Sequence, residues 1–204
     1  MDMYGSGRGL RFFLGFLVVI LVLFLVIVLI VRGGGSDSKK VQETKKTLMS
    51  YVDNPAVTVT QTVIGPVQAS QNHDQATITV SNSSSVMTIY KGYDGSVVDS
   101  KSYPMNQTSF GEFLKALDRA GYTRGNTPEE LKDDRGFCPL GSRYIFTISE
   151  GGNELQRYWA TSCGGTRTYN GNLSLTRALF KNQVPDYYTM VNDANKNSGT
   201  VLSL

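Results

Sequence analysis

The 204-residue sequence predicts one membrane-spanning helix followed by a single α+β domain, in which an antiparallel sheet of about five or six strands packs against two helices. Residues 12–31 form an uninterrupted apolar run, several later segments alternate apolar and polar residues, and two segments carry apolar residues at helical spacing. The predicted parts are a short N-terminal tail (1–11), the membrane helix (12–31), a hinge with a juxtamembrane helix (32–55), the globular domain (56–192) and a flexible tail (193–204).

The apolar run from Phe12 to Val31 is the strongest signal in the chain. As a helix, its 20 residues would cover roughly 30 Å, which is the thickness of the hydrocarbon core of a bilayer. A cleaved signal peptide would carry a shorter apolar segment, of about 7 to 15 residues, before a small-x-small cleavage site. We therefore interpret the run as a retained single-pass anchor whose partner is the lipid bilayer.

Two signals bear on the side of the membrane on which the domain lies. Four lysines follow the anchor, and the positive-inside rule would place them in the cytoplasm. Long domains cross the membrane largely regardless of charge, however, and a pair of cysteines favours an oxidising compartment. We therefore expect a cell-membrane protein whose C-terminal domain lies outside the cytoplasm. The lysines are Lys39, Lys40, Lys45 and Lys46.

After a flexible Gly33–Ser36 hinge, the segment Ser38–Val52 has helical spacing and predicts the juxtamembrane helix. Strands follow, recognised by alternation such as that of the valines and threonines in Val57–Val63. The turn signals Tyr93–Ser96 and Glu150–Asn153 join pairs of strands into hairpins. The predicted strands cover 57–63, 76–80, 86–91, 97–102, 143–149 and 154–161.

The clearest helix of the domain is predicted over Ser109–Ala120. Its apolar residues recur at i, i+3, i+4 and i+7, Ser109 and Glu112 fit a capping box, and Gly121 supplies the stop. One face of this helix must therefore lie on the sheet.

A second helix is predicted over Ser174–Asn182, with Leu175, Ala178 and Leu179 facing inward. Asp186–Asn192 is expected to form one further turn or a short helix before the flexible tail.

The two cysteines, Cys138 and Cys163, flank the hairpin that turns at Glu150–Asn153. If Ser149 pairs with Glu154, paired residue numbers sum to 303, whereas the cysteine numbers sum to 301. The cysteines would then lie nearly opposite each other beyond the open end of the hairpin. We predict a disulfide, which would add roughly 3 kcal/mol by restricting the unfolded chain. The alternative is two unrelated buried thiols.

Composition and motifs argue against several classes of function. The net charge of +3 is small, and no stripe of arginines and aromatic residues indicates nucleic-acid binding. The one histidine, His73, lies in a polar loop where a solvated side chain is expected, and no Gly-x-Ser-x-Gly elbow is present. The acidic cluster Glu129, Glu130, Asp133 and Asp134 lacks the spacing of a calcium loop. We expect no catalysis, metal or cofactor.

The best candidate for a contact surface is the segment Gly164–Gly171, in which Arg167, Tyr169 and Asn170 form a candidate binding loop. Glycine, threonine and asparagine with an aromatic anchor are typical of adaptable recognition loops. An ordinary connecting loop is the alternative, because turns use the same residue types. We expect Trp159, just before this loop, to pack in the core.

The stretch Trp159–Gly165, followed by Leu179–Tyr187, resembles a pattern in uncharacterised single-pass, disulfide-containing surface proteins of ultrasmall, Saccharibacteria-like candidate-phylum bacteria. The resemblance covers the C-terminal quarter of the chain and implies an anchored architecture, with no assigned activity.

The sequence therefore predicts a binding or structural role at the cell surface, with a surface protein or a glycan as the partner. One alternative is a pilin-like filament subunit, although Leu14 stands where pilins carry a glutamate. A second alternative is an anchored enzyme, which would need a cleft that brings His73 or the acidic cluster next to a nucleophile.

Overall fold

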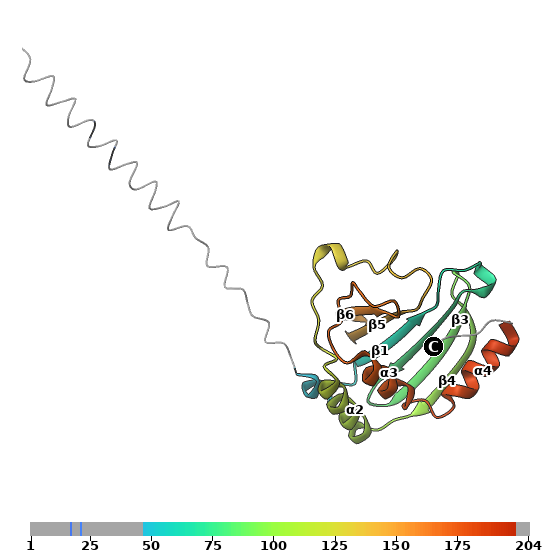
Figure 1. The fold of residues 1–204 in the computed structure, drawn as a ribbon. Coiled ribbons are helices and arrows are strands. Elements are labelled where there is room, and N and C mark those ends of the chain that lie inside the picture. Colours follow the sequence, from blue (N-terminus) through green and yellow to red (C-terminus); the bar gives the residue numbers. More distant parts are fainter. Residues whose placement is uncertain (1–16, 18–20, 22–46, 199–204) are drawn as a thin grey trace, which may run out of the picture. The chain divides into compact units, whose positions relative to one another are not determined.

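A computed structural model describes Leu17, Leu21 and residues 47–198 (Figure 1). Apart from the two leucines, the predicted membrane helix lies outside the described residues, as do most of the predicted juxtamembrane helix and residues 199–204. None of the helices within the described part of the chain has the length and apolar character needed to cross a bilayer. The domain opens with a short 3-10 helix, η1 (Leu48–Tyr51), where the sequence predicted the end of an α-helix.

The domain contains the predicted antiparallel sheet, and the described residues give it six strands in the order β4-β3-β2-β1-β5-β6. The first four strands form a meander that ends at one edge. The chain then returns, so that β5 pairs with the free side of β1 and β6 forms the other edge. The strands are β1 (Val57–Ile64), β2 (Asp74–Val80), β3 (Ser84–Lys91), β4 (Ser96–Pro104), β5 (Arg143–Glu150) and β6 (Asn153–Thr161).

The sheet has one buried face and one more open face, as the alternation in the sequence predicted. In β1 every second side chain, from Val57 to Val63, is buried. Threonines occupy the opposite face and hydrogen-bond across the strands, with Oγ1 atoms 3.2 Å apart between Thr60 and Thr79. The period of two thus separates a hydrophobic layer from a hydroxyl-rich layer.

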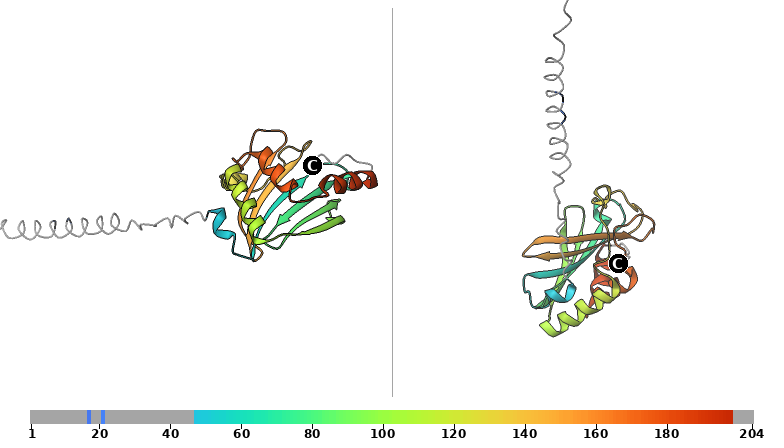
Figure 2. Two further views of the ribbon diagram at one scale, coloured as in Figure 1. Left: turned by 90° about the horizontal axis from the view of Figure 1, so that it is seen from below. Right: turned by 90° about the vertical axis from the view of Figure 1, so that its left-hand side faces the viewer.

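Three α-helices lie across the buried face of the sheet (Figures 1 and 2). The sequence predicted two helices and, over Asp186–Asn192, one further turn or a short helix. The third helix instead continues to Ser198 and includes residues that were assigned to the flexible tail. Val191 and Ala194 are buried, so contact with the core extends the helix past its weak local pattern. The helices are α2 (Gln107–Ala120), α3 (Leu173–Lys181) and α4 (Tyr187–Ser198).

The N-terminus of α2 lies two residues earlier than predicted, and the residue that caps it differs. The Asn106 side chain accepts a hydrogen bond of 2.8 Å from the backbone N–H of Ser109. The predicted capping role of Ser109 is therefore wrong, because Ser109 already lies in the first turn. The predicted stop is confirmed, since Gly121 adopts the left-handed conformation with φ 76°.

The inward face of α3 also differs from the prediction. Leu175 is 43% exposed and Ala178 is exposed, whereas Thr176 and Phe180 are fully buried. Long-range contacts set this orientation: the Thr176 hydroxyl lies 2.6 Å from Tyr169 Oη, and the Phe180 ring packs edge-on against Phe113. Leu179 packs against the core, as expected.

Tyr122, which follows the C-terminus of α2, hydrogen-bonds to the sheet. Its side chain is fully buried, and its Oη lies 3.0 Å from Thr60 O on β1 and 2.9 Å from Thr147 O on β5. Burial raises the pKa of the phenol well above its usual value, so the group remains a neutral donor. One side chain therefore contacts both central strands at the point where the returning chain joins the meander.

Replacing Asn106 with alanine should destabilise the domain by about 1 kcal/mol, because the first turn of α2 would lose its capping acceptor. Urea unfolding of the variant measures this cost. Ser109→Ala is the matched control and should change stability little, since Ser109 is exposed within the helix. If Ser109→Ala lost more stability than the Asn106 variant, the assignment of Asn106 as the cap would be wrong.

Candidate functional site

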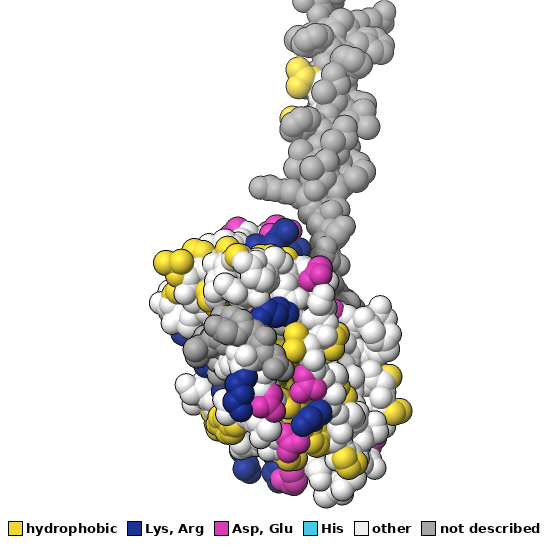
Figure 3. All heavy atoms as spheres, turned by 90° about the vertical axis from the view of Figure 1, so that its right-hand side faces the viewer, with side chains coloured by type: hydrophobic (Ala, Val, Ile, Leu, Met, Phe, Trp, Pro, Cys, Tyr) yellow, Lys and Arg dark blue, Asp and Glu magenta, His cyan; other side chains and the backbone are white. Residues whose placement is uncertain are grey.

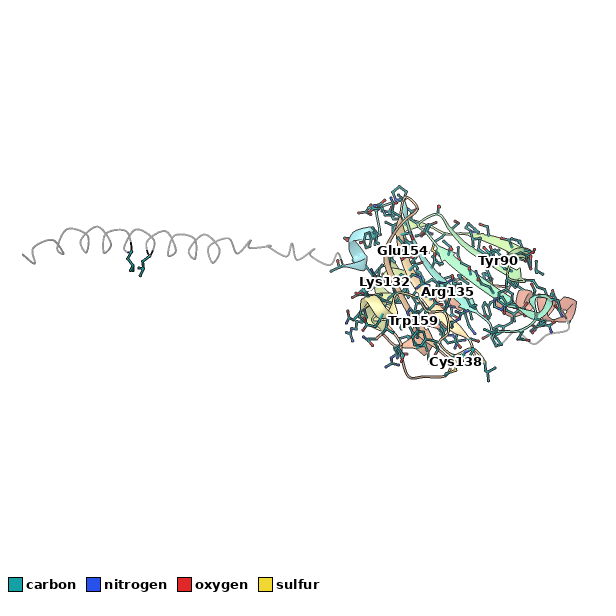
Figure 4. The ribbon with its side chains drawn as sticks, turned by 90° about the horizontal axis from the view of Figure 1, so that it is seen from above. Tyr90, Lys132, Arg135, Cys138, Glu154 and Trp159 are labelled. Atoms are coloured by element: carbon teal, nitrogen blue, oxygen red, sulfur yellow. A yellow bond between two sulfur atoms is a disulfide. The ribbon has the colours of Figure 1, made fainter. Side chains whose placement is uncertain are left out.

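The predicted disulfide between Cys138 and Cys163 is confirmed, with the two Cα atoms 5.7 Å apart. Ser149 pairs with Glu154 as expected, although a register shift follows at Ile148/Ser149. Gly141 lies against the bridge, where an added Cβ would come within 2.6 Å of Cys138 Sγ. The bridge therefore closes the open end of the β5–β6 hairpin and fixes the chain on either side of it (Figure 4).

A buried ion network holds the loop of residues 126–142 against β5 and β6. Asp134, whose side chain is 7% exposed, lies 3.2 Å from the guanidinium of Arg143 on β5 and contacts that of Arg157 on β6. Arg157 also donates to the carbonyl of Lys132, at 3.3 Å. A carboxylate buried with two guanidinium groups has its charge compensated, so the network fixes the loop rather than leaving a reactive acid.

Trp159 provides the second attachment for this loop, and its predicted place in the core is confirmed. The side chain is fully buried, and its indole Nε1 donates to Leu131 O at 2.8 Å. The Phe137 ring packs on the indole with centroids 4.8 Å apart. Together with the disulfide and the Asp134 ion pairs, these contacts hold the loop of residues 126–142 in one position beside β6.

Two other members of the acidic cluster, Asp133 and Glu129, are paired with exposed cations. Asp133 forms hydrogen bonds with Arg135, and these lower the pKa of the carboxyl to about 2. Glu129 lies 2.5 Å from Lys132 in an exposed pair. No group of acidic, histidine and cysteine side chains suited to a metal occurs among the residues that the structure describes.

A groove of about 470 Å³ runs beside the outer edge of β6. Gly125 forms part of the facing wall, and an added Cβ there would come within 2.6 Å of both the Tyr158 ring and Thr168 O. The Gln156 amide is fixed by donating to Tyr122 O at 3.2 Å. Figure 4 marks Lys132 and Glu154, which line the groove from the loop and from β6. The full lining is Gly125, Asn126, Thr127, Lys132, Glu154, Leu155, Gln156, Arg157 and Tyr158.

The groove offers mixed chemistry on a fixed frame. Lys132 and Glu154 carry opposite charges, and the amide side chains of Asn126 and Gln156 also line the groove. Leu155 is 48% exposed and adds an apolar surface. Such a site can contact a polar ligand through hydrogen bonds while covering a small hydrophobic area, and it needs little reorganisation on binding.

The three residues of the predicted binding loop do not share one surface. Arg167 and Asn170 are exposed, but Tyr169 is 1% exposed and belongs to the core. Burial raises the pKa of the Tyr169 phenol, which is hydrogen-bonded to Thr176. The expectation of a surface anchor at Tyr169 is therefore wrong, and none of the three residues lines the groove.

His73 is also placed differently from the expectation of a solvated loop. Its side chain is 5% exposed and stacks on Tyr93 with ring centroids 4.0 Å apart, while Nδ1 lies 3.3 Å from Pro66 O. The neighbouring Asp74 carboxyl has its pKa raised by burial. Neither His73 nor the acidic cluster lines the groove.

The sequence analysis missed the groove because its residues show no chemical motif. They are ordinary strand and loop residues, and their exposure depends on β6 being an edge strand. Comparison with known proteins supplies no family for the chain, since no family model matches it and no curated protein matches it.

Asp134→Ala should destabilise the domain by about 3 kcal/mol, because two largely buried guanidinium groups would lose their carboxylate. Chemical unfolding of the full chain in detergent measures the effect. Asp133→Ala removes the adjacent carboxylate from an exposed pair and should change stability little. Equal losses in the two variants would contradict the assigned role of Asp134.

Proposed function

We propose that this chain is a single-pass membrane protein whose domain lies outside the cytoplasm and binds a partner at the cell surface through the groove beside β6. The groove is the observation that carries the proposal, because it presents exposed side chains while the loop and strand behind them are held by internal contacts. The exposed lining residues are Asn126, Lys132, Glu154 and Leu155. The apolar run at 12–31 supports the anchor by its length. The bilayer is then the partner of the N-terminal segment.

The disulfide supports the extracytoplasmic location. Cys163 is exposed and Cys138 is partly exposed, so reducing agents in the cytoplasm would have access to the bond. Disulfides of this kind persist in oxidising compartments and are rare in the cytosol. The bridge also joins the two segments next to the Asp134 network, so an oxidising environment maintains the frame of the groove.

Of the two partner classes that the sequence suggested, the groove favours a surface protein over a glycan. Leu155, the third residue of β6, presents an exposed aliphatic side chain in a groove whose other lining side chains are mostly polar. A small apolar centre with a polar surround is the usual arrangement of protein interfaces. Lys132 and Glu154 would add charge complementarity, which fixes the orientation of a partner.

Labelling of the native cysteines on intact cells tests the location. A membrane-impermeant maleimide should label Cys138 and Cys163 only after treatment with an impermeant reductant, because the thiols are joined and lie outside. Labelling that needs permeabilised cells and no reductant would mean that the domain is cytoplasmic. Cells that lack the protein control for other labelled thiols.

Photo-crosslinking in living cells tests the groove. Leu155→p-benzoylphenylalanine should give a discrete covalent adduct with a surface protein upon illumination. The same replacement at Leu175 is the matched control, because Leu175 is 43% exposed on α3, outside the groove lining. An adduct from both positions, or from Leu175 alone, would contradict binding at the groove. Absence of a protein adduct from Leu155 would likewise contradict a protein partner.

A further inference from the structure

Strand β4 forms the second edge of the sheet and is exposed along most of its length. Val97 is 61% exposed and Val98 is 42% exposed. Figure 3 views the side of the domain on which β4 and α4 lie, and it shows acidic and basic side chains interspersed with hydrophobic ones. An exposed edge strand carries backbone donors and acceptors that suit pairing with another strand.

The register of the sheet shows which backbone groups of β4 face outward. Met105 N donates to Ser83 O on the β3 side at 3.0 Å. Inward and outward groups alternate along an antiparallel strand, so Lys101 and Tyr103 also bond toward β3. The backbone groups of Ser100 and Ser102 consequently point away from the sheet. Both serine side chains are exposed as well.

Asp99 and Lys101 lie on the other face of β4, one residue on either side of Ser100. Lys101 Nζ lies 3.2 Å from Asp186, which precedes α4. Asp99 lies close enough to contribute to the raised pKa of Lys101, after the larger effect of Asp186. Within residues 47–198 Asp99 forms no ion pair of its own. The strand thus carries one acidic and one basic group symmetrically about Ser100.

We infer that β4 pairs antiparallel with β4 of a second copy of this chain, about a twofold axis at Ser100. Ser100 then faces Ser100 of the other copy, Asp99 faces Lys101, and Val98 faces Ser102. Cross-strand pairs of opposite charge stabilise a sheet, and both copies gain the same pair. The interface is isologous and joins the two sheets into one continuous sheet.

The charges select this register over its neighbours. A shift of the axis to Asp99 would place the two carboxylates opposite each other, and a shift to Lys101 would oppose the two amines. Like charges directly opposite each other destabilise strand pairing. An axis placed between two residues, such as between Asp99 and Ser100, would set side chains from opposite faces of the sheet against each other. With the axis at Ser100, opposite charges face each other and paired side chains lie on the same face of the sheet.

Other features of β4 limit the pairing to a short stretch. A register shift between Ile89 and Tyr90 leaves a bulge opposite them in β4, and Pro104 ends the strand. Bulges and prolines restrict indiscriminate edge pairing. The pairing therefore centres on Asp99–Lys101, with Val98 and Ser102 at its two ends, and it has one register rather than being open-ended.

Cysteine crosslinking of the full chain in detergent and in cell membranes tests the register. In Ser100→Cys, the two thiols lie at the axis with Cα atoms about 5.5 Å apart, within the range of a disulfide. In the matched control Ser102→Cys, the same atoms lie about 14 Å apart along the strands. Mild oxidation should therefore crosslink the first variant at least about tenfold more than the second, since the control exceeds disulfide reach.

Asp99→Lys provides an independent test, because it opposes two lysines and should reduce the crosslinking of Ser100→Cys several-fold. Asp118→Lys makes the same change of charge at an exposed position on α2 and should leave crosslinking unchanged. Equal crosslinking at positions 100 and 102, more at 102, or no effect of Asp99→Lys would overturn the inference. Circular dichroism verifies that each variant is folded.

Discussion

Pairing between β1 and β5 holds the two parts of the sheet together and so positions every other element of the domain. It runs from Val57–Glu150 to Ile64–Arg143 and joins the four-stranded meander to the β5–β6 hairpin. The two strands are far apart in the sequence, so the pairing overcomes a substantial loop-closure entropy. Tyr122 reinforces it by contacting carbonyl groups on both strands. The disulfide, the Asp134 network and the groove all lie on the hairpin that this pairing positions.

The two edge strands of the sheet, β4 and β6, differ in how far their outer backbone is covered. Along β6, the backbone N–H of Trp159 donates to Thr168 Oγ1. The loop that Asp134 holds in place lies beside the remainder of the strand. The result is a groove of defined shape rather than an open edge. Along β4, side-chain charges and a bulge restrict pairing without covering the backbone. We therefore propose that the β6 edge binds a partner, whereas the β4 edge pairs with a second copy of the chain.

Much of the candidate site and of the frame around it could not be predicted, because the burial and position of the residues depend on distant contacts. In the sequence Asp134 was only one member of an acidic cluster without the spacing of a calcium loop, yet Arg143 and Arg157 enclose it in the structure. Tyr169 had the composition of a surface anchor, but its hydroxyl meets Thr176 and its ring packs in the core. Side-chain burial depends on which elements pack together, and no local pattern carries that information.

Features that depend on local periodicity and turn geometry could be predicted from the amino-acid sequence alone. These are the six strands, the two hairpins, the position of α2 and the cysteine pair, which a four-residue turn brings opposite each other. Other features follow from the packing of distant segments: α4 extends over residues of weak pattern, Thr176 rather than Leu175 faces inward, and β6 borders a groove. The physical reason is that strand and turn signals act between neighbours, whereas burial and edge exposure follow from the order in which the strands assemble.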